Sequence, residues 1–96
     1  MQDDEFEWDD AKSDSNLQKH GVSFEDARLV FRDAFAIEQL DNRADYGEDR
    51  FVLTGMAKGF LLVVVYTERE DQIRIISARK ADKRETDGYY QNQTSE

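Results

Sequence analysis

The sequence predicts an α+β fold in which helices pack on an antiparallel sheet, in the order β-α-α-β-β-β-β-α. Three observations lead to this prediction. Two segments with capping residues and helical spacing of apolar side chains occupy about residues 9–32. Four segments with strand character follow between residues 34 and 78, and their connections are too short for parallel crossovers. A third capped segment at about 82–91 closes the chain, and helices segregated on such a sheet define the α+β class.

The N-terminal elements are marked by capping residues. Residues 6–8 alternate between apolar and polar side chains, as in a short strand, and their two aromatic rings are expected in the core. Asp9 or Asp10 can cap a helix that runs to about His20, where a glycine follows. The segment 23–26 is an N-cap signature for a second helix. The apolar face of that helix comprises Phe24, Ala27, Val30 and Phe31.

The later strands are separated by polar turns. Strands are expected over residues 34–40, 50–56, 60–67 and 72–78, with a polar loop at 41–49 and turns at 57–59 and 68–71. Leu61–Val65 is apolar on both faces of the pleat, so its strand should be central. In the last strand, alternation places Arg74 on the face opposite to Ser77. Asp82–Glu85 then forms a capping box for a helix that ends near Gln91.

A chain of 96 residues is long enough for one small core. We expect a single domain over residues 6–91, with flexible tails at 1–5 and 92–96. The absence of cysteine excludes disulfides and cysteine-ligated metals. The longest apolar run, Phe60–Tyr66, is far too short for a membrane span, and the acidic N-terminus is unlike a signal peptide. A cytoplasmic location is therefore expected.

The charge is acidic overall but unevenly distributed. Twenty-two acids and thirteen bases give a net charge of −9, which repels nucleic acid at long range. Residues 69–84 are an exception, with six bases and three acids. Such a stretch is compatible with an anionic ligand, and equally with a solvated strand and helix.

Most familiar catalytic and cofactor motifs are missing. The glycines lack the paired spacing of a phosphate-binding loop. One histidine and no cysteine disfavour a metal site, and the carboxylates that recur every four residues over Asp41–Asp49 are better explained as solvating a loop. A Ser-His-Asp triad built on His20 with Ser23 or Ser77 lacks the strand-to-helix turn that exposes such a serine. We expect no cofactor and no metal.

Two groups of side chains remain as candidates for chemistry. Lys19 and His20 close the first helix, where they either complement the helix dipole or serve as a phosphate contact and a proton-transfer group. Arginines recur along the last two strands, and Arg79 falls just past a strand end, where it can reach over the sheet. Converging arginines would clamp a phosphate, because guanidinium donors match its oxygens. The alternative is salt bridges to Glu68, Glu70 or Asp71.

Several unusual residue groups occur in a fixed order over about residues 6–90. They are Phe6-Glu7-Trp8-Asp9, Lys12, Asn16, residues 19–25 (KHGVSFE), Val30-Phe31, Asp33, Glu48 to Arg50, Leu61–Val65, Thr67–Arg69 and Ile73–Arg79. This pattern resembles the BrnT family of bacterial toxins. The resemblance implies a RelE-like fold and a ribonuclease toxin of a type II toxin–antitoxin module, which cleaves RNA without a metal and inhibits translation. It also implies neutralisation by BrnA, a ribbon-helix-helix antitoxin through which the toxin reaches operator DNA, and a toxin–antitoxin heterotetramer.

The resemblance also suggests which residues carry the chemistry. Such RNA cleavage needs a base for the 2′-hydroxyl, an acid for the leaving 5′-oxygen and cations on the scissile phosphate. We expect His20 or Glu68 as base or acid. The expected phosphate ligands are Lys19, Arg69, Arg74 and Arg79.

Two other functions stay open. A net charge of −9 and the acidic residue Asp82 at the start of the last helix disfavour RNA binding. The chain can instead be a catalytically weak module that docks on a ribbon-helix-helix partner and acts as a co-repressor, with Tyr89 and Tyr90 at the interface. The other alternative is an enzyme acting on a small anionic ligand in a cleft of the sheet.

Overall fold

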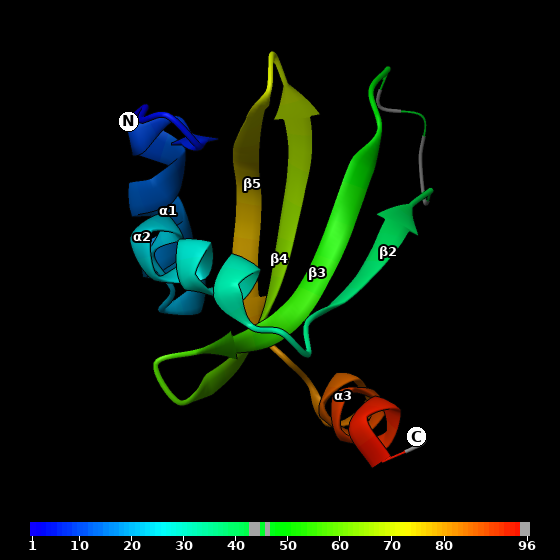
Figure 1. Ribbon diagram of the computed structural model, residues 1–96. Coiled ribbons are helices and arrows are strands. Elements are labelled where there is room, and N and C mark those ends of the chain that lie inside the picture. The colour runs from blue at the N-terminus through cyan, green and yellow to red at the C-terminus, as the bar shows by residue number, and fades with distance from the viewer. Residues whose placement is uncertain (43–44, 46, 95–96) are drawn as a thin grey trace.

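The fold is an open five-stranded sheet with helices on one face and a separate helix at one end (Figure 1). The structure, a computed structural model, describes residues 1–42, 45 and 47–94. Its elements are β1 (Phe6–Glu7), α1 (Asp10–His20), α2 (Phe24–Ala27), the 3-10 helix η1 (Arg28–Arg32), β2 (Ile37–Asp41), β3 (Arg50–Ala57), β4 (Phe60–Arg69), β5 (Gln72–Lys80) and α3 (Lys83–Thr94). The predicted α+β class and element order are confirmed.

The strands lie in the order β1-β5-β4-β3-β2. Neighbours from β2 to β5 pair antiparallel, whereas the two-residue β1 pairs parallel with β5. The apolar run in β4 predicted a central strand, and β4 indeed lies in the middle of the sheet. The edges of the sheet are therefore β2 on one side and the short β1 on the other.

The predicted capping signals at the first two helices are confirmed. The Asp9 carboxylate accepts a hydrogen bond from the backbone N–H of Lys12 at 3.2 Å. Gly21 ends α1 in the left-handed region, with φ 69°. The Ser23 hydroxyl accepts from the backbone N–H of Asp26 at 3.0 Å. These local signals were readable because each depends on residues within one turn of the helix.

Several boundaries differ from the expected ones. The second helix continues as the 3-10 helix η1 after Ala27, and β2 begins only at Ile37. The delay arises because the Asp33 carboxylate holds a turn, accepting from the backbone N–H of Phe35 at 2.9 Å. At the C-terminus, residues 92–94 extend α3. Residues 95 and 96 of the expected tail, and 43, 44 and 46 of the expected loop, lie outside the described residues.

The first five residues fold back on the elements that follow, although the sequence suggested a flexible tail. The amino group of Met1 donates to the backbone carbonyl of Trp8 at 3.0 Å. The Asp3 carboxylate accepts from the backbone N–H of Phe6 at 2.7 Å. This turn lies against the short β1 and the start of α1, so the N-terminal segment is held by hydrogen bonds at both of its ends.

The hydrophobic core lies between one face of the sheet and the helices α2 and η1. Phe24 and Val64 are fully buried, and the aromatic pair Phe6 and Trp8 is buried as predicted. The helix η1 and the segment after it approach β3 so closely that a Cβ added at Gly55 would lie within 3.1 Å of three side-chain atoms. The core occupies one face of the sheet, and we call the other face the open face.

A β-bulge in β5 decides which side chains reach the open face. The register of β5 against β4 shifts between Ser77 and Ile75, which leaves Ile76 as an extra residue. The expectation that Arg74 and Ser77 lie on opposite faces is wrong, because the extra residue brings them to the same face. Arg79 lies on this open face as well. Its register partner Val63 is on the same face of β4 as Val65, the partner of Ser77.

The buried side chain of Asn16 ties α1 to the edge of β5. The short β1 covers this edge only at Ile73 and Arg74. Farther along, the Asn16 amide donates to the backbone carbonyl of Ala78 at 2.7 Å and accepts from its N–H at 3.2 Å. It also donates to the carbonyl of Val22 at 2.8 Å. One side chain thus provides the pair of hydrogen bonds that a neighbouring strand would make.

We predict that Asn16→Ala strongly destabilises the fold. The substitution leaves both backbone groups of Ala78 without their partner in a buried position, which should lower the free energy of unfolding by about 3 kcal/mol. Urea denaturation followed by circular dichroism measures the change. Gln18→Ala, which removes an exposed amide from the same helix, is the control and should change stability by less than about 0.5 kcal/mol. Equal stabilities for the two variants would show that the Asn16 contacts contribute little.

Candidate functional site

The open face of the sheet and the start of α3 border a cavity of about 500 Å³. Its floor is apolar and consists of Val52, Val63 and Val65 from β3 and β4. The chemically active side chains that line it come from four other elements: His20 from α1, Asp41 from β2, Ser77 and Arg79 from β5, and Glu85 from α3. Concave sites with an apolar floor and a few convergent polar groups are the usual form of a binding or active site.

His20 reaches this cavity because α1 is held against β5. The Asn16 amide lies one helical turn before His20 and fixes α1 beside Ala78, the neighbour of Ser77 and Arg79. His20 itself is exposed at the C-terminus of α1. His20 and Ser77 also line a second, shallower hollow of about 230 Å³.

Two lysines of α1 line this second hollow. Lys12 and Lys19 lie in it beside His20, and both are exposed. Lys19 and His20, which the sequence placed together, thus line the same shallow hollow. Lys19 does not line the cavity of about 500 Å³. The two hollows share His20 and Ser77, and the larger one is lined by Arg79 while the smaller one is lined by the two lysines.

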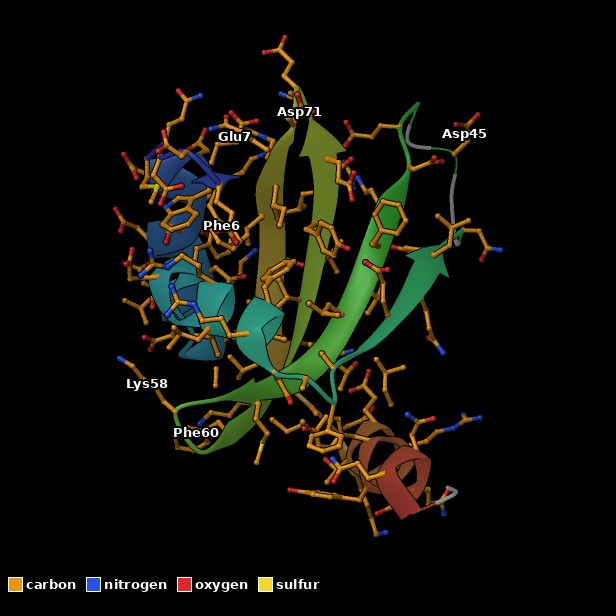
Figure 2. The ribbon with its side chains drawn as sticks, in the orientation of Figure 1. Phe6, Glu7, Asp45, Lys58, Phe60 and Asp71 are labelled. Atoms are coloured by element: carbon orange, nitrogen blue, oxygen red, sulfur yellow. The ribbon has the colours of Figure 1, made fainter. Side chains whose placement is uncertain are left out.

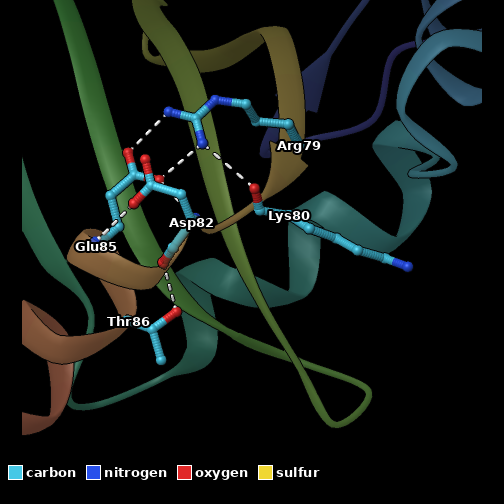
Figure 3. A network of polar contacts seen from close by, with 5 residues as sticks. All are labelled: Arg79, Lys80, Asp82, Glu85 and Thr86. Carbon is cyan, nitrogen blue, oxygen red and sulfur yellow. Dashed lines mark hydrogen bonds and ion pairs between the residues drawn. The ribbon is translucent and has the colours of Figure 1, made fainter.

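Arg79 lies on the other side of the cavity and is held by Glu85 (Figure 3). Both terminal nitrogens of its guanidinium donate to the Glu85 carboxylate at 2.7 Å, one to each oxygen. One of them also donates to the backbone carbonyl of Lys80 at 3.3 Å. This bidentate geometry is the one in which arginine also binds phosphate.

Glu85 is fixed in turn by the capping box that begins α3. Its carboxylate accepts from the backbone N–H of Asp82 at 2.9 Å, and the Asp82 carboxylate accepts from the N–H of Glu85 at 2.8 Å. The capping box predicted from the sequence, with Asp in place of Ser or Thr, is confirmed. Hydrogen bonding from Arg79 lowers the pKa of Glu85 to about 2, against a smaller opposing effect of burial.

The other two predicted arginines lie at the far end of the sheet. Arg74 shares the open face but pairs with Glu7 at 3.7 Å, and Arg69 pairs with Glu48 at 3.5 Å. Figure 2 shows Glu7 near the turn between β4 and β5, the end of the sheet away from α3. On β4, the partners of Arg74 and Arg79 are four residues apart, which corresponds to about 13 Å.

The three arginines therefore do not form the single cluster that the expected phosphate clamp requires. Of its three arginines, Arg79 alone lines the cavity. All three are paired with carboxylates, as the alternative proposed, but the carboxylates belong to Glu7, Glu48 and Glu85 and not to the nearby residues named there. The true partners lie on other elements, so spacing along β4 and β5 does not reveal them.

Glu68 does not reach the site either. Its register position, opposite Ile73, places it on the core face of the sheet, at the exposed end of β4. It is therefore separated from His20 and Arg79 by the sheet itself. Of the two groups expected as base or acid, only His20 lies at the cavity.

The structure adds residues that the sequence did not mark as part of a site. Glu85 has the sequence signature of a helix cap, but it also pairs with Arg79, which lies six residues before it. Asp41 is one of several carboxylates around the polar loop in the sequence, but it ends β2 and is 7% exposed at the cavity. Ser77 lies on the face opposite to the one that alternation predicts, because nothing in the sequence marks the bulge.

Tyr89 is not at a surface, contrary to the expectation that it contributes to an interface. It is 3% exposed, and its hydroxyl donates to the Asp33 carboxylate. Burial and this hydrogen bond raise the pKa of Tyr89 to about 12. For Asp33, burial opposes ionisation, but hydrogen bonds from Tyr89 and from the backbone of Met56 and Phe35 outweigh it and lower its pKa. Tyr90, by contrast, is exposed.

The geometry also bears on metal binding and on a serine-based triad. Among residues 1–42, 45 and 47–94, no three His, Asp or Glu side chains converge as metal ligands. For a serine-based triad, the Ser23 hydroxyl is engaged in capping α2. Ser77 and His20 line the same cavity, but among the described residues no hydrogen bond joins their side chains. The polar groups at the cavity therefore suit binding of an anion and proton transfer by an imidazole better than nucleophilic attack by serine.

We predict that the ion pair of Glu85 makes stability depend on pH in the acid range. The folded-state pKa of about 2 lies below the ordinary value of 4.5, so the contribution is complete above pH 4.5 and is lost as the pH falls toward 2. Glu85→Gln should lower the free energy of unfolding by about 1–2 kcal/mol at pH 7, and the difference should vanish near pH 2. Urea denaturation at several pH values measures this. The exposed Asp87→Asn is the control, and a difference independent of pH for Glu85→Gln would contradict the prediction.

Comparison with known proteins identifies a family. Residues 8–85 match the family model described as ribonuclease toxin, BrnT, of type II toxin–antitoxin system. The matched segment includes β2 to β5 and every residue that lines the larger cavity. No curated protein matches the chain. No helix among the described residues is long and apolar enough to cross a membrane. With most of its length matched, the chain belongs to the BrnT family, the ribonuclease toxins of type II toxin–antitoxin systems.

Proposed function

We propose that this chain is an endoribonuclease toxin that binds the backbone of its RNA substrate on the open face of the sheet, in the cavity between His20 and Arg79. One observation carries the proposal: a group that can transfer protons and a guanidinium come from distant parts of the chain to one cavity, in a family of ribonuclease toxins. The cavity of about 500 Å³ is large enough for one nucleotide and is open to the solvent, as a polymeric substrate requires.

The proposed chemistry uses the nucleophile of the substrate. The 2′-hydroxyl of RNA attacks the adjacent phosphorus, a bond to the 5′-oxygen breaks, and a cyclic 2′,3′-phosphate and a free 5′-hydroxyl result. One proton leaves the 2′-oxygen and one is delivered to the 5′-oxygen, and an imidazole such as that of His20 can perform either transfer. Arg79 stabilises the extra negative charge on the phosphoryl oxygens. Because the substrate supplies the nucleophile, we propose that cleavage needs no metal ion.

Cations around the cavity extend the proposed contact with RNA. Lys12 and Lys19 border the hollow next to His20, and Arg74 lies farther along the same face. We assign them to phosphates that flank the cleaved one, because one phosphate cannot span about 13 Å. Arg69, at the same far end, is assigned likewise. Glu68 has no part in the proposed chemistry, since it lies on the core face.

The proposed partner is a ribbon-helix-helix antitoxin of the BrnA type, which would neutralise the toxin, carry it to operator DNA and form a heterotetramer. The acidic charge of −9 supports a contact with a basic, DNA-binding partner. Phe35, Leu40 and Tyr90 are exposed, and Leu40 belongs to β2, an edge of the sheet. Exposed apolar side chains at a free edge suit the core of a protein interface.

We predict that Arg79→Ala and His20→Ala each lower the rate of RNA cleavage by about 100-fold or more. Each substitution removes a group from the cavity, and both residues are exposed, so the fold should remain. Cleavage of a labelled RNA by purified protein, in buffer containing a chelator, measures the rate and tests the absence of a metal requirement. Lys58→Ala removes a cation from the turn between β3 and β4 (Figure 2) and is the matched control. Unchanged rates in both cavity variants would refute the assignment.

The second candidate function is the catalytically weak binding module. One observation favours it: the guanidinium of Arg79 is already paired with the Glu85 carboxylate, in a chain whose net charge is −9. We predict that expression of the wild-type chain in a bacterial host without the antitoxin arrests growth and translation, and that co-expression of the antitoxin restores both. His20→Ala should not arrest growth but should still bind the antitoxin. If the wild-type chain binds the antitoxin but leaves growth and RNA intact, the binding module is the correct function.

A further inference from the structure

In the first half of the helix α3, Glu85 and Tyr89 each make a polar contact with the rest of the protein. At its start, Glu85 pairs with Arg79 in the bidentate geometry shown in Figure 3. One turn later, the hydroxyl of Tyr89 donates to Asp33. Figure 1 shows that α3 lies apart from the other helices, at the end of the sheet opposite the turn between β4 and β5. These two contacts therefore help to hold α3 in its position.

The packing beneath α3 is open. A cavity of about 400 Å³ separates α3 from β2 and β3, next to the cavity of about 500 Å³, and both are bordered by Val52 and Glu85. Within residues 83–93 of α3, Tyr89 is the only buried side chain. Helices of this length are marginal without tertiary contacts, and Gly88 weakens this one further. Release of α3 should thus cost far less free energy than global unfolding.

The Glu85 carboxylate occupies donors that a phosphate can use. A guanidinium has five N–H donors, and the parallel pair on its two terminal nitrogens fits two oxygens of a carboxylate or two oxygens of a phosphate, but not both at once. In the docked position of α3, each of the two terminal nitrogens of Arg79 donates to one oxygen of Glu85. Glu85 is also held by the backbone of Asp82, so it cannot turn away without disturbing the start of α3.

We infer that Glu85 is an autoinhibitory group, an internal carboxylate that competes with the RNA phosphate for Arg79, and that α3 must be released from Arg79 before RNA binds productively. The inference concerns regulation of the proposed ribonuclease site and rests on that function. The ligand that displaces Glu85 is a phosphodiester of the RNA backbone. The competition lowers the affinity of the isolated toxin for RNA in proportion to the time that Glu85 holds Arg79.

The test compares two substitutions on α3 that change the charge equally. Glu85→Gln keeps the shape of the side chain but removes the charge that pairs with Arg79. Asp87→Asn is the matched control, because Asp87 pairs with Lys83 at 2.7 Å and does not contact Arg79. Inorganic phosphate is titrated while the side-chain NMR signal of Arg79 is followed, in the wild type and in both variants.

Glu85→Gln should lower the apparent dissociation constant for phosphate at Arg79 by about fivefold, and Asp87→Asn should leave it within about twofold. Hydrogen exchange of the α3 amides should accelerate in Glu85→Gln and not in Asp87→Asn. A dissociation constant in Glu85→Gln equal to that of Asp87→Asn overturns the inference. Tyr89→Phe provides a second route, because it loosens the Asp33 contact with Arg79 and Glu85 intact, and it should strengthen phosphate binding in the same direction.

RNA assays distinguish failure of the inference from failure of the proposed function. With a non-cleavable RNA carrying 2′-O-methyl groups, Glu85→Gln should bind about fivefold more tightly than the wild type, and the gain should disappear in the Arg79→Ala background. If phosphate binds Arg79 more tightly in Glu85→Gln but no variant cleaves RNA, the competition holds and the ribonuclease assignment fails. If RNA is cleaved and Glu85→Gln gains neither affinity nor rate over Asp87→Asn, the ribonuclease stands and the autoinhibition is wrong.

Discussion

The hydrogen bonds between Asn16 and Ala78 are the contact on which the arrangement of this protein depends. A sheet edge with free N–H and C=O groups needs partners, and β1 covers only the first part of the β5 edge. The amide of Asn16 supplies both a donor and an acceptor to the next part. The same contact fixes the position of α1 on β5, and with it the place of His20 beside Ser77. A stabilising feature of the fold thus also assembles the candidate site.

The sheet separates stability from chemistry. Its core face packs on α2 and η1, closely enough that Gly55 cannot carry a side chain without displacing its neighbours. Its open face is covered only in part, by α3, and two cavities remain beneath that cover. The strand β4 serves both faces, since Leu62 and Val64 are in the core while Val63 and Val65 form the floor of the larger cavity. Polar and charged groups at the rim can therefore vary without loss of the core.

At Arg79, one acidic residue of this acidic chain is in direct contact with a cation of the candidate site. Across the whole chain, a net charge of −9 opposes an RNA substrate, and at the cavity one carboxylate opposes it directly. A bidentate pair with an arginine acts at short range and needs a specific geometry. The Glu85 carboxylate can therefore control one phosphate contact at Arg79, in addition to its small share in the long-range repulsion of RNA by the whole chain. The same geometry that makes Glu85 a good partner for Arg79 makes it a competitor of phosphate. The pair between Arg79 and Glu85 therefore contributes to the stability of the fold and also competes with the binding of a phosphate.

The order of the elements, the central position of β4 and the family could be predicted from the sequence alone, and so could the caps at Ser23 and Asp82 and a cap at Asp9 or Asp10. Each of these depends on residues that are close in the chain, or on a pattern of residue types along it. Which charged groups meet depends on the tertiary structure. The bulge at Ile76 moved Ser77 to the face of Arg74 and Arg79, and the carboxylates that hold the arginines come from β1, α3 and the segment before β3. Strand register and helix docking result from the balance of packing over the whole molecule, and no short segment contains that information.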